Sequence, residues 1–271
     1  SKGGGVHLAN NTTLTLSGSA VIQNCTATNF ANSGEAYGGG VSAACVKEIT
    51  LADSARIVGC TAANGSGLYI TGSQVPGYGI LHANGGSVDG DVVLGDTEDG
   101  PCTITGSGET VFKGKVTVTP GSTIEKGTFN GEVINNGTIT RCRYSGGMTA
   151  KDSLGGLVYT NNGTIEACYV YAGQLNGGSR IEMYNGGWAG GIAYENTGTI
   201  VNSYFYGDIV QAQSNGTVRD IISWGAIAYK NSGKVSNCYY GADGDDGYGG
   251  KTKNQFSGGE VAYLLNGGTA R

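Results

Sequence analysis

We predict an all-β fold in which similar coils stack on one another as a parallel β-solenoid. A pattern that begins at Gly155 returns at Gly190 and again at Gly225, 35 residues later each time. Internal repetition at such a period is typical of stacked structural units. No segment carries a long apolar pattern with a period of 3.6 residues, which argues against helical repeats.

Each copy of the pattern is predicted to form a strand, a turn and a second strand. In the first copy, Leu157–Tyr159 is short, apolar and β-prone, and Thr164 opens a second β-prone run that ends in aromatic residues. The intervening Asn-x-Gly at 161–163 favours a turn, because Gly adopts a positive φ without steric cost and Asn tolerates one. Parallel pairing of such units would place successive coils about 4.8 Å apart.

The N-terminal segment repeats with the same offset. Gly3–Val6 recurs as Gly38–Val41, and the alternation in Thr13–Leu16 recurs in Glu48–Leu51. Both ends of the chain also share a β-branched residue followed three positions later by Cys. This signature occurs at Ile22/Cys25, Ile57/Cys60, Ile139/Cys142, Ile165/Cys168 and Val235/Cys238, and at Ile200 the Cys is replaced by Ser203.

The shared signature predicts a single β-helix over residues 1–250. We divide it into Gly-Gly-Gly-Val repeats at 1–72, irregular coils at 73–130 and the C-terminal repeat series at 131–250. The irregular part is predicted to form shorter coils of the same stack. Its expected strands are Asp91–Leu94, Cys102–Thr105, Val111–Phe112, Lys115–Thr119 and Thr123–Ile124.

The C-terminal segment 251–271 is predicted to be a cap or linker. Thr252–Gln255 has the form of a capping box, and Asn266-Gly267 is a stop signal. We therefore expect one short helix from Thr252 to Leu265, which would cover the open end of the solenoid.

The composition argues against nucleic acid and membrane as partners. The net charge is −5, 14% of residues are charged, and no basic patch is interleaved with aromatics, so nucleic acid is not an expected partner. No apolar run approaches 18 residues, so we expect no membrane insertion. The sequence begins Ser1-Lys2-Gly3 without Met or a signal peptide, and we expect further domains in the same polypeptide.

The three C-terminal copies resemble the GLUG motif of bacterial surface proteins, roughly Gly-Gly-Leu-Val-Gly, Asn-x-Gly and Ile-x-Asn-Cys-Tyr. Tyr159, Tyr194 and Tyr229 stand where the first segment of that pattern often ends in Gly. The Gly-Gly-Gly-Val repeats resemble β-helix repeats of large adhesins, and Lys251 through Asn266 resembles a closing segment found in Gram-positive gut bacteria. The resemblance implies a right-handed, pectate-lyase-like parallel β-helix in a secreted, cell-wall-attached multidomain protein.

The seven cysteines have two structural interpretations. One is an internal ladder of reduced thiols that act as small apolar fillers. The other is a disulfide between Cys25 and Cys60 or between Cys142 and Cys168, since equivalent residues on adjacent coils fall within the Cα range for a disulfide.

One cation site is a candidate. Asp243, Asp245 and Asp246 lie on a Gly-rich turn and could supply hard oxygen ligands for Ca²⁺, although the EF-hand spacing is missing. A solvated surface turn is the structural alternative. No other cofactor is expected.

The aromatic residues suggest a binding surface. Tyrosine occurs 16 times. Six tyrosines end the second strand of the repeat copies and would form rows along one flank of a stack: Tyr169, Tyr171, Tyr204, Tyr206, Tyr239 and Tyr240. Such rows would be core fillers or an exposed platform for sugars or a protein partner. The expected ligand contacts come from the insertions Gly173–Gly187 and Gly207–Ser223. We name Tyr184, Trp188 and Trp224 as the candidate ligand-binding residues.

These observations predict a non-catalytic extracellular module, structural or adhesive, on a bacterial cell surface or cell wall. Its expected partners are a host or dietary glycan or a host surface protein. The alternative is a polysaccharide-degrading enzyme, a lyase or glycoside hydrolase, on the same fold. Its acidic and basic residues would come from Asp89, Asp91, Asp96, Glu98, Asp99, Lys113, Lys115, Arg141 and Arg143.

Overall fold

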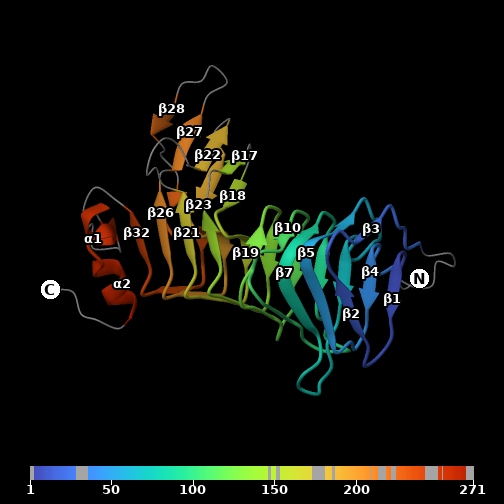
Figure 1. Cartoon of the computed structure of the whole chain (residues 1–271). Coiled ribbons are helices and arrows are strands. Elements are labelled where there is room, and N and C mark those ends of the chain that lie inside the picture. Colours follow the sequence, from blue (N-terminus) through green and yellow to red (C-terminus); the bar gives the residue numbers. More distant parts are fainter. Residues whose placement is uncertain are drawn as a thin grey trace. The chain divides into compact units, whose positions relative to one another are not determined.

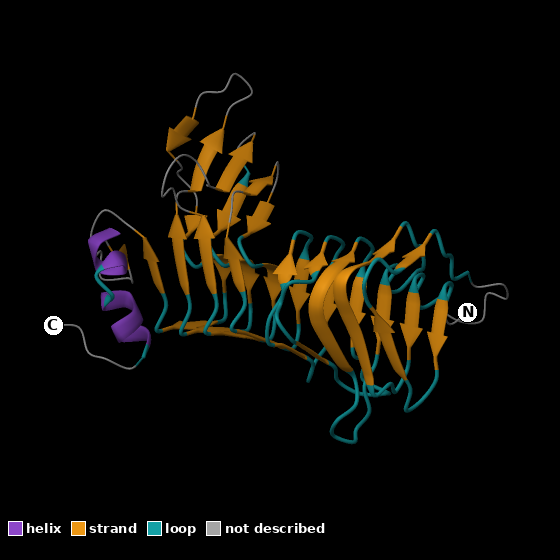
Figure 2. Ribbon diagram, in the orientation of Figure 1, coloured by secondary structure: helices purple, strands orange, loops and turns teal. Residues whose placement is uncertain are grey.

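The computed structural model describes residues 3–28, 36–145, 148–150, 153–172, 181–184, 187–207, 209–212, 218–220, 224–241, 250–251 and 253–266. The chain forms two compact units, Ser1–Cys142 and Arg143–Arg271. In each unit, short parallel strands from successive coils pair in chain order and are joined by turns (Figure 2). This is the predicted parallel β-helix, and the single β-helix over residues 1–250 stays a prediction.

The first unit has one sheet with a single strand per coil, in the order β1, β4, β6, β8, β11 and β14. All described pairs in it are parallel, for example Val6 opposite Val41. Its strands are β1 (Val6–Leu8), β4 (Val41–Ala43), β6 (Leu68–Ile70), β8 (Val92–Leu94), β11 (Val116–Val118) and β14 (Val133–Asn135).

Two further faces of the first unit are joined through the long strands β5 (Glu48–Val58) and β7 (Ile80–Val88). The first half of β5 pairs with β2 and its last residues pair with β3. Similarly, β7 pairs with both β9 and β10. The remaining strands are β2 (Thr13–Leu16), β3 (Val21–Gln23), β9 (Thr103–Thr105), β10 (Val111–Phe112), β12 (Thr123–Ile124), β13 (Thr128–Phe129) and β15 (Thr138–Thr140).

The predicted strands of the irregular middle are confirmed. Strands β8 to β12 fall within the five segments expected there and stack on their neighbours in parallel. Their coils are shorter, since Val92 pairs with Val116, whereas Val6 pairs with Val41. Inward side chains such as Leu94, Ile104 and Ile124 are fully buried, which explains why the alternating pattern of these strands is readable.

The repeated Cys position follows a sharp corner. The residue directly before it has a left-handed conformation at all six sites: Asn24, Gly59, Arg141, Ala167, Asn202 and Asn237. Asn and Gly tolerate a positive φ, so their use at four of these corners has a physical reason. All seven cysteines are free thiols.

Each coil of the second unit runs through five sheets. Three of these sheets contain strands of the C-terminal repeat. The first has β19 (Val158–Asn161), β24 (Ala193–Asn196) and β30 (Ala228–Asn231), and the second has β20 (Thr164–Glu166), β25 (Thr199–Val201) and β31 (Lys234–Ser236). The third has β16 (Arg143–Ser145), β21 (Tyr169–Ala172), β26 (Tyr204–Gly207), β32 (Tyr239–Gly241) and β33 (Gly250–Lys251). The predicted offset of 35 is confirmed, since Val158 pairs with Ala193 and Tyr169 with Tyr204.

The predicted insertion loops also contain strands. Figure 1 shows β22 (Ile181–Tyr184), β27 (Ile209–Ala212) and β28 (Val218–Asp220) beside one another at the top, with β17 (Met148–Ala150). The last sheet contains β18 (Ser153–Gly155), β23 (Trp188–Gly190) and β29 (Trp224–Gly225). Insertions of successive coils lie next to each other, so their backbones pair instead of remaining separate loops.

The C-terminal segment forms two helices where one was predicted. Helix α1 (Lys253–Ser257) ends before Gly258, and α2 (Glu260–Leu265) begins after Gly259, whose φ of 81° is left-handed. A left-handed Gly terminates a helix, so the predicted continuous helix is wrong at this point. The expected stop at Asn266 is confirmed, because Asn266 is the C-cap.

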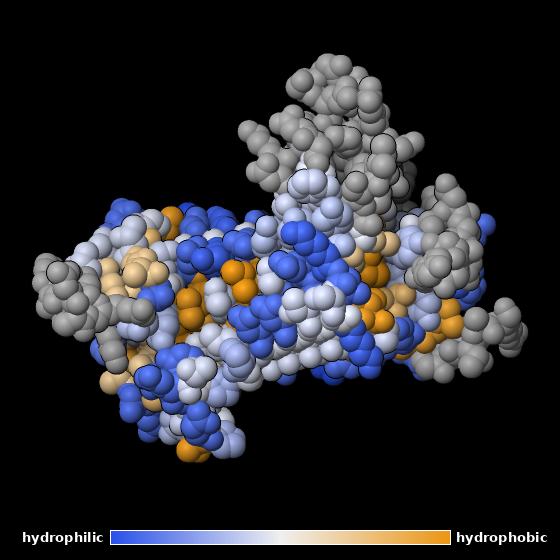
Figure 3. All heavy atoms as spheres, turned by 180° about the vertical axis from the view of Figure 1, so that it is seen from behind, coloured by the Kyte–Doolittle hydropathy of each residue, from blue (hydrophilic) through white to orange (hydrophobic). Residues whose placement is uncertain are grey.

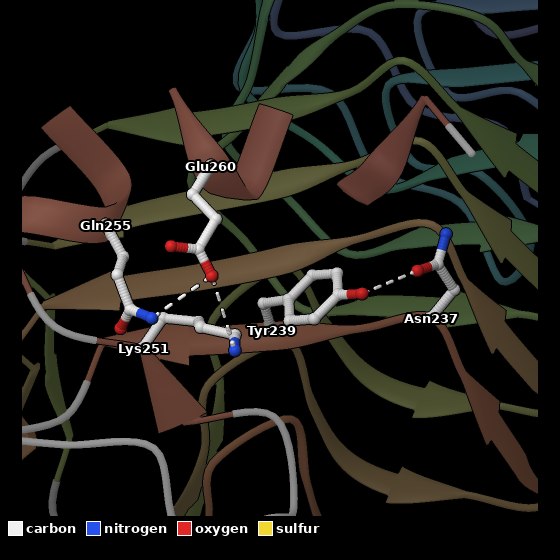
Figure 4. A network of polar contacts seen from close by, with 5 residues as sticks. All are labelled: Asn237, Tyr239, Lys251, Gln255 and Glu260. Atoms are coloured by element: carbon white, nitrogen blue, oxygen red, sulfur yellow. Dashed lines mark hydrogen bonds and ion pairs between the residues drawn. The ribbon is translucent and has the colours of Figure 1, made fainter. Parts of the chain in front are cut away.

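The helices are held to the last strands by the polar network of Figure 4. Lys251, which is only 5% exposed, lies 3.7 Å from Glu260, and Gln255 donates a hydrogen bond of 3.1 Å to the same carboxylate. In the view of Figure 3, hydrophobic surface appears only as separate patches among hydrophilic residues. The apolar side chains are mainly inside the coils.

Candidate ligand-binding surface

Three tyrosines form a continuous row of rings on the second unit. Tyr159, Tyr194 and Tyr229 occupy the same position in β19, β24 and β30. Ring centroids are 5.0 Å apart for Tyr159 and Tyr194 and 5.6 Å apart for Tyr194 and Tyr229, with interplanar angles of 23° and 20°. Each stacked pair contributes about 0.5–1.5 kcal/mol beyond area burial.

Trp188 extends this row from the neighbouring strand β23. Its ring stacks on Tyr229 at 6.1 Å and 19°, and the residue is 44% exposed. It is one of only four large hydrophobic residues exposed among those described. We call Tyr159, Tyr194, Tyr229 and Trp188 the aromatic row.

The tyrosines of the row are not equally exposed. In β19, Val158 and Asn161 are buried, while Tyr159 and Thr160 between them are both half-buried, which breaks strict alternation. Tyr229 is also half-buried, whereas Tyr194 is only 6% exposed, because its ring lies between those of Tyr159 and Tyr229. The column beside the tyrosines is Thr160, Glu195 and Lys230, which are directly in register.

A glycine bend places Trp188 beside the row. Gly190 links β23 to β24, and a Cβ added there would collide with the carbonyl oxygen of Ala193. Gly155 and Gly225 occupy the same bend in the other two coils and would meet the equivalent carbonyl oxygens. Only Gly allows the chain to turn this closely.

Lys230 gives the surface a positive charge. Its Nζ lies 5.1 Å from the centroid of the Tyr194 ring, within the range of a cation–π contact. A hydrogen bond with Tyr194 raises the pKa of Lys230, so this exposed amine is charged at neutral pH.

Of the three predicted ligand-binding residues, the structure defines the surroundings of Trp188. The backbones of Tyr184 and Trp224 lie in β22 and β29, and Trp224 pairs with Ala189, next to Trp188. The side chains of Tyr184 and Trp224, and Asp243, Asp245 and Asp246 entirely, lie outside the described part. Within that part, no group of three or more His, Cys, Asp or Glu residues could hold a metal ion.

The tyrosines at the end of the repeat belong to a different environment. Tyr169 stacks on Tyr204 at 5.0 Å, and Tyr171 stacks on Tyr206 at 5.3 Å. Phe256 of α1 then contacts both Tyr204 and Tyr206, at 5.6 and 4.8 Å. Burial raises the pKa of Tyr204. These rings form a structural contact between strands and helix.

Sequence reasoning singled out this second set of tyrosines and missed the aromatic row. The available signal was the spacing, because Tyr159, Tyr194 and Tyr229 recur every 35 residues. The sequence did not reveal on which side of the strand each ring lies, because buried and outward residues do not alternate strictly in β19.

The acidic residues of the first unit have structural partners. Asp89 forms an ion pair of 2.9 Å with Lys113. Burial alone would raise the pKa of Asp89, but contacts with Lys113 and Ser87 outweigh it and lower the pKa. Asp96 accepts a hydrogen bond of 2.7 Å from the Tyr69 hydroxyl, and Asp99 accepts one of 2.9 Å from Thr71.

Lowered pKa values do not suit a general acid. The carboxyl of Asp96 would also have a raised pKa from burial alone, but hydrogen bonds from Tyr69 and three backbone amides lower it. The acid of a glycosidase pair needs a raised pKa. These two carboxylates are therefore better suited to structural contacts, Asp89 with Lys113 and Asp96 within the acidic turn, than to proton donation.

No protein-family model matches the chain, and neither a curated protein nor a solved structure matches it. Among the described residues, no helix has the length and apolar character needed to cross a membrane. The candidate function therefore rests on the chemistry of the aromatic row.

Proposed function

We propose that this β-helix is a non-catalytic extracellular module that binds a carbohydrate through the aromatic row. The observation that carries the proposal is Trp188, a 44% exposed indole stacked at 6.1 Å on Tyr229. An exposed indole that is backed by a row of stacked rings offers a flat apolar face in a fixed position, and this face gains free energy when a sugar ring covers it.

The support behind Trp188 favours binding of a partner without rearrangement. Three stacked tyrosines and the glycine bend fix the position of the indole before a ligand arrives. A pre-ordered contact loses less conformational entropy on binding. Since the tyrosine faces are largely covered by one another, the indole is the ring that presents apolar surface to a sugar.

A glycan-array screen of the protein tests the proposal, with polysaccharides offered in a parallel reducing-sugar assay with and without EDTA. We expect binding without product. Trp188→Ala should weaken binding to the positive glycans at least tenfold. The matched control is Tyr263→Ala, which removes another exposed aromatic residue, 54% exposed on α2, and should bind as the parent does.

Three results would contradict the proposal. Binding that Trp188→Ala leaves unchanged would remove the aromatic row as the site. An array without any bound glycan would leave the structural role of a spacer. Release of reducing ends, above all release abolished by EDTA, would favour the polysaccharide-degrading alternative.

A further inference from the structure

Two cysteines occupy equivalent positions on the first two coils of the chain. Cys25 follows β3 and Cys60 follows β5, and the residues on both sides are directly in register: Gln23 with Val58, and Thr26 with Thr61. Parallel strands lie about 4.8 Å apart. This spacing falls inside the Cα range of roughly 4.4–6.8 Å that a disulfide requires.

The thiols lie close to the same coil boundary. The Cys60 thiol lies 3.9 Å from the carbonyl oxygen of Ile22 on the preceding coil, while the Cys25 thiol donates to the carbonyl of Gln23 at 3.2 Å. The Cys60 thiol also donates to the carbonyl of Val58 on its own coil, at 3.4 Å. Cys60 thus reaches the coil that carries Cys25, and it is near enough to raise the pKa of the Cys25 thiol.

The equivalent position in the second unit lacks such a pair. There, Ser203 stands between Cys168 and Cys238, and its hydroxyl accepts a hydrogen bond from the backbone of Cys168. Adjacent coils of that unit thus present Cys beside Ser. Among the described residues of each unit taken separately, this repeat position brings two cysteines together only at Cys25 and Cys60.

A cross-link between these cysteines would also stabilise the folded state. Cys25 and Cys60 lie 35 residues apart, and a cross-link between such positions lowers the entropy of the unfolded chain.

We propose that Cys25 and Cys60 form a disulfide that fastens the first coil to the second when a low-molecular-weight disulfide such as oxidised glutathione is present. Cys25 is half-buried and Cys60 buried, so Cys25 reacts first. Its thiolate attacks one glutathione sulfur and releases one glutathione thiolate. The Cys60 thiolate then attacks the Cys25 sulfur of the mixed disulfide and releases the second. The oxidant is reduced to two glutathione thiols, which take up the two protons that the cysteines lose.

Burial and the neighbouring Cys60 raise the pKa of the Cys25 thiol. Little thiolate is then present at neutral pH, so the proposed exchange is slow at pH 7 and accelerates towards pH 9.

The test oxidises the folded protein with oxidised glutathione at pH 8.5, then unfolds it and counts the remaining thiols. The chain has seven cysteines, and loss of two should leave five. Tryptic digestion without reduction should yield a cross-link between peptides 3–47 and 57–113. Because these peptides also contain Cys45 and Cys102, single-site variants assign the bond.

The cross-linked peptides should persist in Cys45→Ser and Cys102→Ser and disappear in Cys25→Ser and Cys60→Ser. Each variant is first compared with the parent by circular dichroism, so that a folding defect is recognised. Mass analysis of the unmutated protein provides a test that needs no variant. Seven reactive thiols after oxidation, a stable mixed disulfide at Cys25, or a cross-link that survives Cys25→Ser would each overturn the proposal.

Discussion

The buried asparagines of the second unit act at the scale of single residues. Asn161 and Asn196 are fully buried, and each amide donates to the next asparagine along the stack, at 2.7 and 2.8 Å. Each buried amide needs its hydrogen-bond partner at the matching position of the next coil, because a buried polar group without a partner lowers the stability of the fold. This ladder therefore helps to align the coils.

We expect Asn196→Ala to lower the free energy of unfolding by about 1–3 kcal/mol, because it removes the acceptor of one amide and the donor to another. Urea denaturation gives the value. The control is Asn162→Ala at an exposed position bonded to Thr197, which should cost about 0.5 kcal/mol or less. Equal losses in the two variants would show that the buried ladder has no special role.

Asp96 gives a prediction for pH at the same scale. Its folded-state pKa is lowered, so its contribution to stability is present above the unfolded pKa of about 3.9 and is lost as the pH falls through the folded pKa. Asp96→Asn should therefore be less stable than the parent by about 1–2 kcal/mol at pH 7, and the gap should narrow below pH 4. Urea denaturation at both pH values checks this, and a gap independent of pH would contradict it.

At the scale of elements, the C-terminal helices complete a row of rings. Tyr171 and Tyr206 recur at 35 residues, but the next position is Gly241. A Cβ on Gly241 would come within 3.0 Å of the Tyr206 ring, and Phe256 lies 4.8 Å from that ring. Because Gly241 in β32 has no side chain, the ring of Tyr206 can contact α1.

Phe256→Ala should therefore loosen the helices without unfolding the coils. Loss of two ring contacts corresponds to about 1–3 kcal/mol. Hydrogen exchange of residues 253–266 should become faster, while exchange in β19, β24 and β30 stays the same. Tyr263→Ala, at an exposed position on α2, is the control and should not change either. Equal acceleration in both variants would contradict a docking role for Phe256.

The sequence predicts these elements well where one physical signal dominates. The strands at 92–94 and 103–105 are readable because buried apolar residues alternate with half-buried ones. The continuous helix was wrong because two glycines at 258 and 259 outweigh the helical pattern around them. The insertions were expected as loops because their pairing depends on the adjacent coil, which local sequence does not encode.

At the scale of the whole molecule, the 35-residue repeat predicts which strands stack, but it does not predict which side chains are available to a ligand. The offset of 35 predicts parallel coils and is confirmed by the register of Tyr169 with Tyr204. It does not distinguish tyrosines covered by Phe256 from those on the aromatic row, because this depends on α1 and on the glycine bends. Trp188 was predicted as a contact, and its stacking on Tyr229 required the structure.

The most direct measurement is the emission of Trp188 during titration with a glycan that the array identifies. The chain has two tryptophans, so Trp224→Phe leaves Trp188 as the sole indole. We expect a blue shift and a saturable change in intensity, with protection from acrylamide, since a sugar that covers the exposed ring removes water from it. Saturable binding to this variant with unchanged Trp188 emission and quenching would show that the ligand binds elsewhere and would contradict the aromatic row as the site.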